Sequence, residues 1–382
     1  MKAILAFEDG TVFRGKGFGA RKTTVGEAVF NTSEFGYEEL LTDPSAHKNI
    51  VVMTFSEIGC YGITTEDCES CGVKAAGLVV AQECRTPSNW RSKKSLPDFL
   101  SENGIPAISG VDTRAITVKI RRNGTLKACL STEDISDEDA VRRAREWRGL
   151  DGADSAGEVS CKTPWHFDTE KIDIEPFKLG GVHINNKTRT EPLFKCAVLD
   201  FGAPLSMLKS LAFCGFDLTV FPSDTSAEEI LATSPDCLFL SSGAGDPAGA
   251  ITAQKTVAEL AKKLPTMGVG FGHQILALAF GGKTYKLKFG HHGENHPSQN
   301  IQTKTAKITT QNHTYAVAAN SLANTGLKVS EVNLTDGTVE ALRHESLPVF
   351  SVQYRPEPAP GSLGSEYEFD TFYKLVKSAK KA

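Results

Sequence analysis

The chain has 382 residues and a formal net charge of −4, from 42 basic and 46 acidic side chains. Hydrophobic residues make up 40% of it and charged residues 23%, which is ordinary for a soluble globular protein. This length predicts two or three domains, each with its own core. The balanced charge argues against a general nucleic-acid binder, and no apolar run reaches the ~18 residues that a membrane span needs. We therefore expect a soluble, cytoplasmic protein that contacts neither nucleic acid nor membrane.

Short β-type runs separated by turn signals dominate residues 1–150, for example the run 49–55. A charged helix is expected over 132–148, with Thr132 as its N-cap. Residues 151–192 contain several glycines and little periodicity, which is typical of a connector. The first part of the chain is thus predicted to form a β-rich mixed domain followed by a connector.

Strands and helices alternate with short loops in the last part of the chain, residues 193–382. The expected strands cover residues 195–200, 218–221, 237–240 and 265–269. One of the helices between them is predicted to start with a capping box formed by Ser226 and Glu229. This alternation predicts an α/β domain with a central, mostly parallel sheet flanked by helices. Ligands of such sheets bind at the carboxyl ends of the strands.

The segment 267–274, Met-Gly-Val-Gly-Phe-Gly-His-Gln, has the layout of a nucleophile elbow between a strand and a helix. Small residues at 268 and 272 permit the sharp turn, and the helix N-terminus offers N–H groups to an anion. The nucleophile position itself is Gly270. A glycine has no side chain with which to attack a substrate.

Ordered motifs run along nearly the whole chain. They include Leu-Thr-Asp-Pro-Ser (41–45), Pro-Ser-Asn-Trp-Arg (87–91), Gly-Val-Asp-Thr-Arg (110–114), Lys-Leu-Lys-Phe-Gly-His (286–291), Gln-Asn-His (311–313) and Phe-Ser-Val-Gln-Tyr (350–354). On these motifs the chain resembles the small chain of carbamoyl phosphate synthetase, a class I glutamine amidotransferase. The resemblance implies an N-terminal small-chain domain that contacts a partner, followed by a glutamine amidotransferase domain.

In that family the small chain hydrolyses L-glutamine and passes ammonia through a tunnel to a large synthetase subunit. The resemblance therefore implies a large-subunit partner, with ATP and Mg²⁺ on that partner and no cofactor or metal in this chain. It places the complex in pyrimidine and arginine biosynthesis and leaves open higher oligomers of the heterodimer.

The family's activity rests on a Cys-His-Glu triad, in which the thiolate attacks the amide and the imidazole carries the proton. Carried over to this chain, the nucleophile position is Gly270, the histidine position is Arg355, and only the carboxylate, Glu357, remains. Arginine cannot shuttle protons near neutral pH. We therefore expect a small subunit without glutaminase activity in a complex that uses free ammonia.

The resemblance also implies the residues that hold the glutamine. They are Ser45, Gly243, Gly245, Phe271, Gln274, Asn312, Thr314 and Tyr315. Several of them depart from the family pattern, which has leucine for Phe271 and Gly-Phe for Thr314-Tyr315. Glu294 stands where glycine is usual. The departures gather at functional loops, as expected when one activity is lost on a retained scaffold.

Other interpretations stay open at this point. Ser241, Ser242 or Cys237 could replace the nucleophile, with His273 or His313 as its base. The cleft could instead bind an amino-acid-like or anionic ligand, with Arg355 at its base. Arg355 is otherwise expected on the surface or in a salt bridge with Glu357. The chain could also be an inactivated or redesigned variant of a normal small chain.

Two groups of residues, one of cysteines and one of histidines, are candidate metal ligands. Cys60, Cys68, Cys71 and Cys84 fall in one short stretch, but they lack finger-like spacing, so free reduced thiols are preferred to a zinc site. His291, His292 and His296 form a second group, for which hydrogen bonding within a loop is preferred to metal binding.

Overall fold

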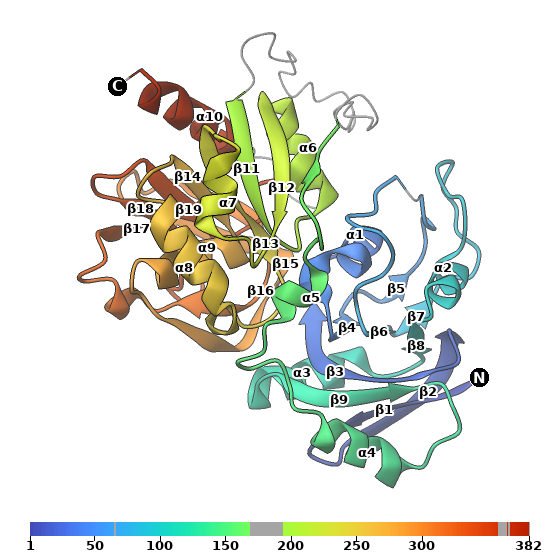
Figure 1. Cartoon of the computed structure of the whole chain (residues 1–382). Coiled ribbons are helices and arrows are strands. Elements are labelled where there is room, and N and C mark those ends of the chain that lie inside the picture. The colour runs from blue at the N-terminus through green and yellow to red at the C-terminus, as the bar shows by residue number, and fades with distance from the viewer. Residues whose placement is uncertain (65, 169–193, 358–364, 366, 382) are drawn as a thin grey trace.

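The computed structural model describes residues 1–64, 66–168, 194–357, 365 and 367–381. Figure 1 shows two bodies side by side, a β-barrel built from the N-terminal part and a large sheet covered by helices built from the C-terminal part. The predicted connector contains the short helix α5 (Ser155–Val159) and the strand β10 (Trp165–His166). Its residues 169–192 lie outside the described residues, and the domain boundaries stay predictions.

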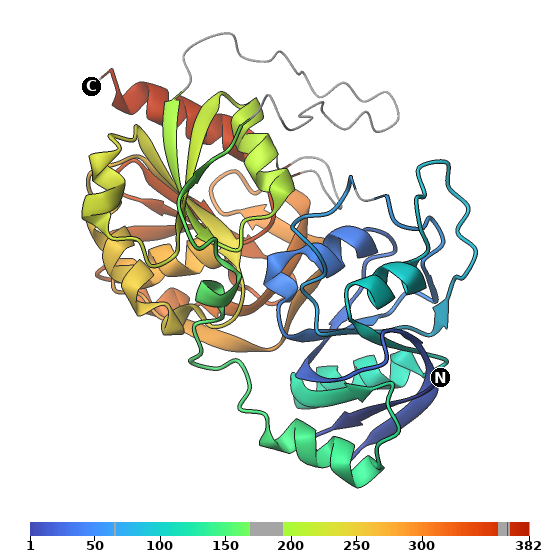
Figure 2. The ribbon, with the colours of Figure 1, turned by 45° about the vertical axis from the view of Figure 1, so that its right-hand side comes forward.

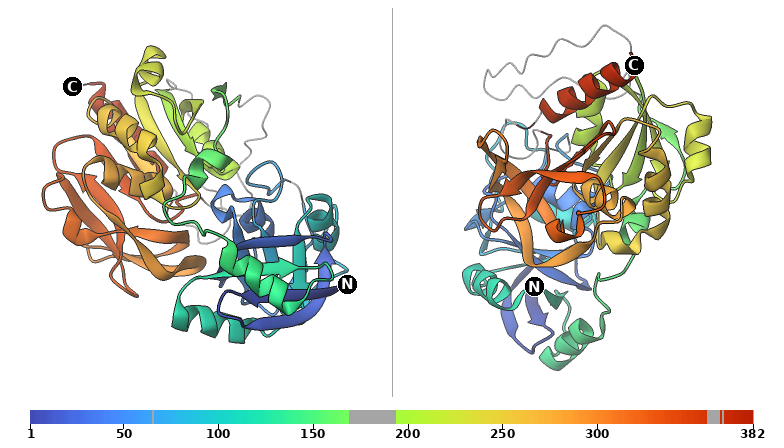
Figure 3. Two further views of the ribbon diagram at one scale, coloured as in Figure 1. Left: turned by 60° about the horizontal axis from the view of Figure 1, so that its bottom comes forward. Right: turned by 90° about the vertical axis from the view of Figure 1, so that its left-hand side faces the viewer.

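Seven strands close the N-terminal barrel in the order β1-β2-β8-β6-β4-β3-β9 (Figure 3, left). These strands are β1 (Lys2–Phe7), β2 (Val12–Gly19), β3 (Thr23–Asn31), β4 (Asn49–Met53), β6 (Gly77–Val79), β8 (Pro106–Ser109) and β9 (Leu126–Ser131). The run β3-β4-β6-β8 is parallel and the other pairs are antiparallel. Four helices contribute buried residues to its cores, α1 (Tyr37–Thr42), α2 (Leu96–Glu102), α3 (Thr113–Asn123) and α4 (Asp137–Glu146). The β-rich prediction for this part is confirmed.

The predicted start of the helix at Thr132 is wrong. Helix α4 begins at Asp137, and the Ser136 side chain caps it by accepting a hydrogen bond from the Asp139 N–H. The Thr132 hydroxyl is used elsewhere, because it accepts from the Lys22 N–H and donates to the Ala20 carbonyl oxygen. Thr132 therefore fastens the end of β9 to the β2–β3 connection instead of starting a helix.

The C-terminal sheet has ten strands in the order β10-β12-β11-β13-β14-β19-β18-β17-β15-β16. Besides β10, the sheet contains β11 (Phe194–Phe201), β12 (Phe216–Pro222), β13 (Cys237–Gly243), β14 (Thr266–Val269), β15 (Thr284–Asn300), β16 (Ala306–Val317), β17 (Leu327–Asn333), β18 (Val339–His344) and β19 (Val349–Val352). The central run from β12 to β19 is parallel, as predicted. The extension from β18 to β16 is antiparallel and was not predicted.

Helices cover both faces of this sheet (Figure 1). Helices α6 (Leu205–Phe213) and α10 (Tyr367–Ala379) share a core with Val198, whereas Ala197 and Leu199 pack with the helices of the other face. Those helices are α7 (Ala227–Ala232), α8 (Ile251–Leu260) and α9 (Phe271–Ala279). The alternation along β11 follows from the period of two in a strand. Both hydrogen bonds of the predicted capping box at the start of α7 are present.

Short elements of the barrel domain face the sheet domain. Helix α1 (Tyr37–Thr42) and the 3₁₀ turn η1 (Pro44–Ala46) lie next to α5 where the two bodies meet (Figure 2). Strands β5 (Glu57–Ile58) and β7 (Gln82–Glu83) form a separate two-stranded sheet. Within the described ranges, no helix is long and apolar enough to cross a membrane.

Candidate functional site

The predicted elbow is formed between β14 and α9. Gly270 has φ 56° and ψ −109°, and its N–H donates to the Val352 carbonyl oxygen over 2.9 Å. A Cβ at position 268 would lie 2.7 Å from the Gly272 oxygen, and one at position 272 would lie 2.3 Å from the Leu240 oxygen. The turn therefore requires glycine on both sides of position 270. The backbone of a nucleophile elbow is present without the nucleophile.

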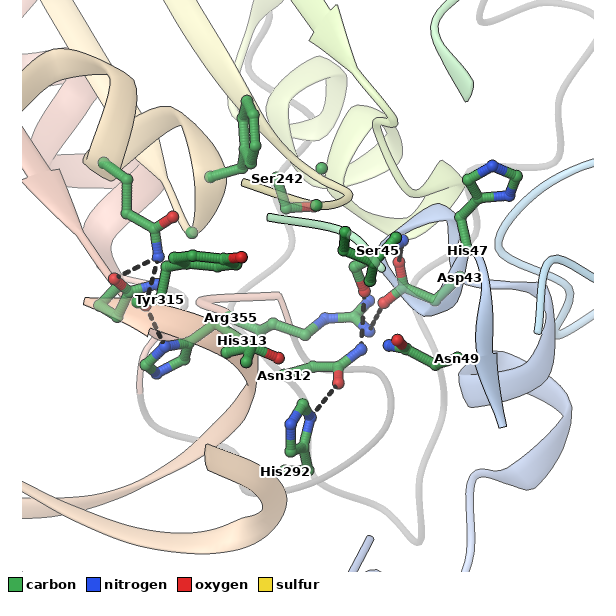
Figure 4. Close-up of a pocket in the computed structure, with 18 of the residues that line it drawn as sticks. Asp43, Ser45, His47, Asn49, Ser242, His292, Asn312, His313, Tyr315 and Arg355 are labelled. Carbon is green, nitrogen blue, oxygen red and sulfur yellow. Dashed lines mark hydrogen bonds and ion pairs between the residues drawn. The ribbon is translucent and has the colours of Figure 1, made fainter. Parts of the chain in front are cut away.

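One cleft between the two bodies gathers every predicted binding residue (Figure 4). Its lining includes Ser45 from η1, Gly243 at the end of β13, Gly245 after it, Phe271 and Gln274 from α9, and Asn312, Thr314 and Tyr315 from β16, together with Gly270 and Arg355. The cleft lies beyond the carboxyl ends of β13 and β14, where an α/β sheet places its ligands. Residues far apart in the sequence thus line one cleft, and their role in binding stays a prediction.

Hydrogen bonds fix the polar side chains of the cleft. The Asn312 side-chain nitrogen donates to the Ser45 hydroxyl over 2.6 Å, and its oxygen lies 2.8 Å from Nδ1 of His292 (Figure 4). Burial lowers the pKa of His292 to about 4, so a neutral imidazole donates to Asn312. Gln274 donates to the Tyr315 carbonyl oxygen over 2.6 Å and to the Gln353 side-chain oxygen over 3.0 Å.

Arg355 lies at the centre of a buried ion cluster that joins the two bodies. Its Nη1 is 2.6 Å from Asp43, its Nη2 is 3.1 Å from Glu69, and its Nε is 2.7 Å from Glu357. The side chain is 8% exposed and the three carboxylates are 2% exposed or less. The expected salt bridge with Glu357 is therefore present, but the expected surface position is wrong because Asp43 and Glu69 of the barrel domain cover the guanidinium.

The charge balance of this Arg355 cluster is one cation against three carboxylates. Burial lowers the pKa of Arg355, but the nearby carboxylates of Asp43, Glu357 and Glu69 together raise it by more. The net effect is a raised pKa, so the guanidinium stays charged. Burial raises the pKa of Glu69 to about 7 against the opposing effect of Arg355, and burial also raises the pKa of Glu357. Glu69 also accepts hydrogen bonds from the Ser206 N–H and hydroxyl, over 2.9 and 2.7 Å, at the start of α6.

A second, smaller cavity lies beyond Arg355. It is lined by Asn31, Ser33, Gly36, Leu40, Gly293, Thr310, Gln311, Asn312 and Arg355. Asn312 and Arg355 also line the cleft, so these two side chains form the wall between the two spaces. Three ion pairs fix the Arg355 side chain in this wall.

None of the candidate substitute nucleophiles is built as one. The Ser241 hydroxyl accepts from the Phe201 N–H and donates to the Ser242 carbonyl oxygen. Cys237 is buried in the core, where burial raises the pKa of its thiol well above the usual value. The Ser242 hydroxyl lines the cleft and has no hydrogen-bond partner among the described residues.

The two candidate bases are engaged elsewhere. Nδ1 of His273 is 2.9 Å from the Ser351 hydroxyl, and burial lowers the pKa of His273 to about 3. Nδ1 of His313 donates to the Tyr315 carbonyl oxygen over 2.7 Å, and burial lowers its pKa as well. In the hydrogen bonds of the described ranges, neither imidazole pairs with any of the three candidate nucleophiles. A nucleophile-base pair, which this chemistry requires, is therefore not assembled.

The histidines of β15 are held by side-chain contacts. Nε2 of His291 is 2.9 Å from Asp336, and its ring packs against those of His296 and His313. Burial lowers the pKa of His296 to about 4. The expected hydrogen bonding is present for His291, but the expected loop is wrong, because His291, His292 and His296 all lie on β15.

The elbow, the cleft at the strand ends and the helices on both faces define the scaffold of a class I glutamine amidotransferase. The sequence model of that class, "Glutamine amidotransferase class-I", matches residues 197–375. The model "Carbamoyl-phosphate synthase small chain, CPSase domain" matches residues 5–130.

Full-length relatives extend this match. The carbamoyl phosphate synthase small chain of Syntrophotalea carbinolica is 44% identical over 382 residues, which is 100% of both chains. That of Akkermansia muciniphila is 43% identical and covers 100% of this chain and 99% of its own. That of Aquifex aeolicus is 44% identical over 98% of this chain and 99% of its own. The chain belongs to the carbamoyl phosphate synthase small chain family.

Replacing Gly270 should lower stability. A side chain at φ 56° is strained, and a Cβ there would lie 3.3 Å from the Ser242 Cβ, a tight contact. We expect Gly270→Cys and Gly270→Ala each to cost on the order of 1–3 kcal/mol of unfolding free energy, measured by urea titration. A similar loss in both variants would assign the effect to the backbone and Cβ. An unchanged or higher Tm would contradict it.

Removing Arg355 should be more damaging, because three buried carboxylates lose their cation. Breaking a buried ion cluster from one side typically costs ~3–5 kcal/mol, so Arg355→Met should unfold at much lower urea than the wild-type chain. The matched control is Arg114→Met, at an exposed position on α3, which should change stability little. Equal effects of the two variants would show that the Arg355 cluster does not stabilise the chain.

Glu69 should make stability depend on pH. The folded chain keeps this proton up to about pH 7, whereas the unfolded chain releases it near 4.5. Its contribution is therefore fully present below about pH 4.5 and lost as the pH rises through about 7, by ~1.4 kcal/mol per unit at most. Relative to Glu69→Gln, the wild-type chain should lose stability across this window. Glu66→Gln, at a mostly exposed carboxylate nearby, should leave the profile unchanged.

Proposed function

We propose that this chain is the small subunit of a carbamoyl phosphate synthase complex and does not hydrolyse glutamine itself, so that the complex takes ammonia from solution. The observation that carries the proposal is the formed elbow with Gly270 at the position of the nucleophile. A thiolate cannot be supplied there, and losing a triad member typically removes several orders of magnitude of rate.

The Arg355 cluster supports a structural role for this subunit. Arg355 replaces the group that would carry the proton, and it bonds instead to Asp43 and Glu69 of the barrel domain. Together with Asn312 it also separates the cleft from the second cavity. In an ammonia-using complex this wall would seal the subunit against loss of ammonia through the unused cleft.

The names and full-length match of the relatives support a large-subunit partner. The proposal places ATP and Mg²⁺ on that subunit and no cofactor in the cleft of this chain. It also places the heterodimer, alone or in higher oligomers, in the cytoplasm and in pyrimidine and arginine biosynthesis.

A second candidate function is binding of an amino-acid-like ligand such as L-glutamine without turnover. The Ser242 hydroxyl and the Gln353 side-chain nitrogen line the cleft, and both are buried without a hydrogen-bond partner among the described residues. Buried polar groups of this kind are costly unless something pairs with them. An anionic ligand at Arg355 is less favoured, because each of its three side-chain nitrogens already donates to a carboxylate.

The test is reconstitution of the chain with its large subunit, followed by carbamoyl phosphate formation from glutamine and, separately, from ammonium. We expect product with ammonium and none with glutamine. Gly270→Cys/Arg355→His, checked for folding by its Tm, is the comparison that returns the triad residues. Product from glutamine with the wild-type chain would overturn the proposal, and a rise in Tm with glutamine but no turnover would support the binding function.

A further inference from the structure

A group of three ligand-bearing side chains lies on the barrel domain, outside the cleft. The carboxylate of Glu57 and the thiol sulfurs of Cys60 and Cys84 all lie within 4.8 Å of one another. The four-cysteine group weighed from the sequence is not assembled. Cys68 instead donates to the Glu38 carboxylate over 3.3 Å, and Cys71 is exposed.

The backbone around the three side chains is fixed by the small sheet of β5 and β7. Glu57 pairs with Gln82 in parallel register, and the Cys84 N–H donates to the Ile58 carbonyl oxygen over 2.8 Å. Ile58 is 1% exposed and belongs to the core formed with α2, so it anchors this sheet. Gly59, at φ 105°, permits the close approach, because a Cβ there would lie 3.0 Å from the Cys84 oxygen.

The three side chains have few other partners. Cys60 makes only a weak sulfur contact of 3.8 Å to the Glu57 carbonyl oxygen, and Cys84 makes one of 3.5 Å to that of Thr86. Among the ion pairs of the described ranges, none involves the Glu57 carboxylate. The ligand atoms are therefore available for a cation.

From this geometry we propose that Glu57, Cys60 and Cys84 bind a divalent zinc-like metal ion. Two thiolates and one carboxylate are a donor set that selects Zn²⁺ over Mg²⁺ or Ca²⁺. Two sulfurs on one tetrahedral zinc lie ~3.8 Å apart at Zn–S distances of ~2.3 Å, so side-chain rotation within the present 4.8 Å suffices. The fourth position is left to water or to a ligand from another molecule. Cys60 is exposed and Cys84 half-buried, so the ion can enter from solvent.

The chemistry of the ligands sets how the site should respond to pH. A thiol binds a metal ion as the thiolate, so both thiols would lose their protons on binding. The affinity should therefore rise with pH.

The test uses the full chain, kept reduced, and titrates it with Co²⁺ and then Zn²⁺. We expect one Co²⁺ per chain with thiolate-to-cobalt charge-transfer absorption that Zn²⁺ abolishes, and a higher Tm with Zn²⁺. Cys60→Ser and Cys84→Ser should each lose at least half of this absorption, and Glu57→Gln should weaken binding by ~10-fold or more. Cys71→Ser, at an exposed cysteine outside the group, should bind as the wild-type chain does.

A second measurement needs no variant. Zn²⁺ should protect Cys60 and Cys84 of the wild-type chain from alkylation, as read by peptide mass spectrometry, while exposed Cys71 stays reactive. The proposal is overturned if the wild-type chain shows no charge-transfer absorption, if Cys60→Ser and Cys84→Ser retain all of it, or if Cys60 and Cys84 are alkylated as fast with Zn²⁺ as without it. None of these outcomes depends on glutamine hydrolysis, so the proposed function stands or falls separately.

Discussion

The buried guanidinium of Arg355 is the interaction on which the relation between the two bodies depends. It takes one carboxylate from its own domain, Glu357, and two from the barrel domain, Asp43 and Glu69. The two carboxylates of the barrel domain each make a further contact. Asp43 caps η1 by accepting from the Ser45 N–H and so positions Ser45 in the cleft, and Glu69 holds the start of α6 through Ser206. A cation at position 355 therefore organises the cleft wall, a helix start and the domain contact together.

The scaffold of the cleft does not depend on a nucleophile at position 270. The glycines at 268 and 272 are enforced by contacts below 3 Å to backbone atoms, whatever stands between them. The polar chain from His292 through Asn312 to Ser45 is likewise complete without a nucleophile. Position 270 is different, because a Cβ there would lie within 3 Å of no backbone atom, although any side chain would be strained at this φ. Glycine at this position thus leaves the fold intact and avoids strain at one point.

Local sequence patterns predicted the structural features that depend on residues close together in the chain. The capping box at Ser226, the elbow and the central parallel strands follow from neighbours a few residues apart, and all are present. The cleft residues were reached through a family resemblance rather than through spacing. The contacts of Arg355 with Asp43 and Glu69 could not be predicted from local patterns. Arg355 is 312 positions from Asp43 and 286 positions from Glu69 in the sequence, and only the fold brings them together. The Glu57, Cys60 and Cys84 group was missed for the same reason, since two loops had to be brought together by β5 and β7.

The residue at position 355 sets the charge balance where the two bodies meet. A histidine at 355 has one ring and at most two donors, whereas the arginine here donates to three carboxylates at once. With histidine at position 355, Asp43 or Glu69 would lose its hydrogen bond to this side chain. Burial would then favour the protonated form of that carboxylate. Arginine pairs with all three carboxylates, but it cannot shuttle a proton near neutral pH. Without that proton transfer, a thiolate at position 270 could not complete the reaction. In the proposed inactive subunit, glycine at position 270 and arginine at position 355 are therefore consistent with each other.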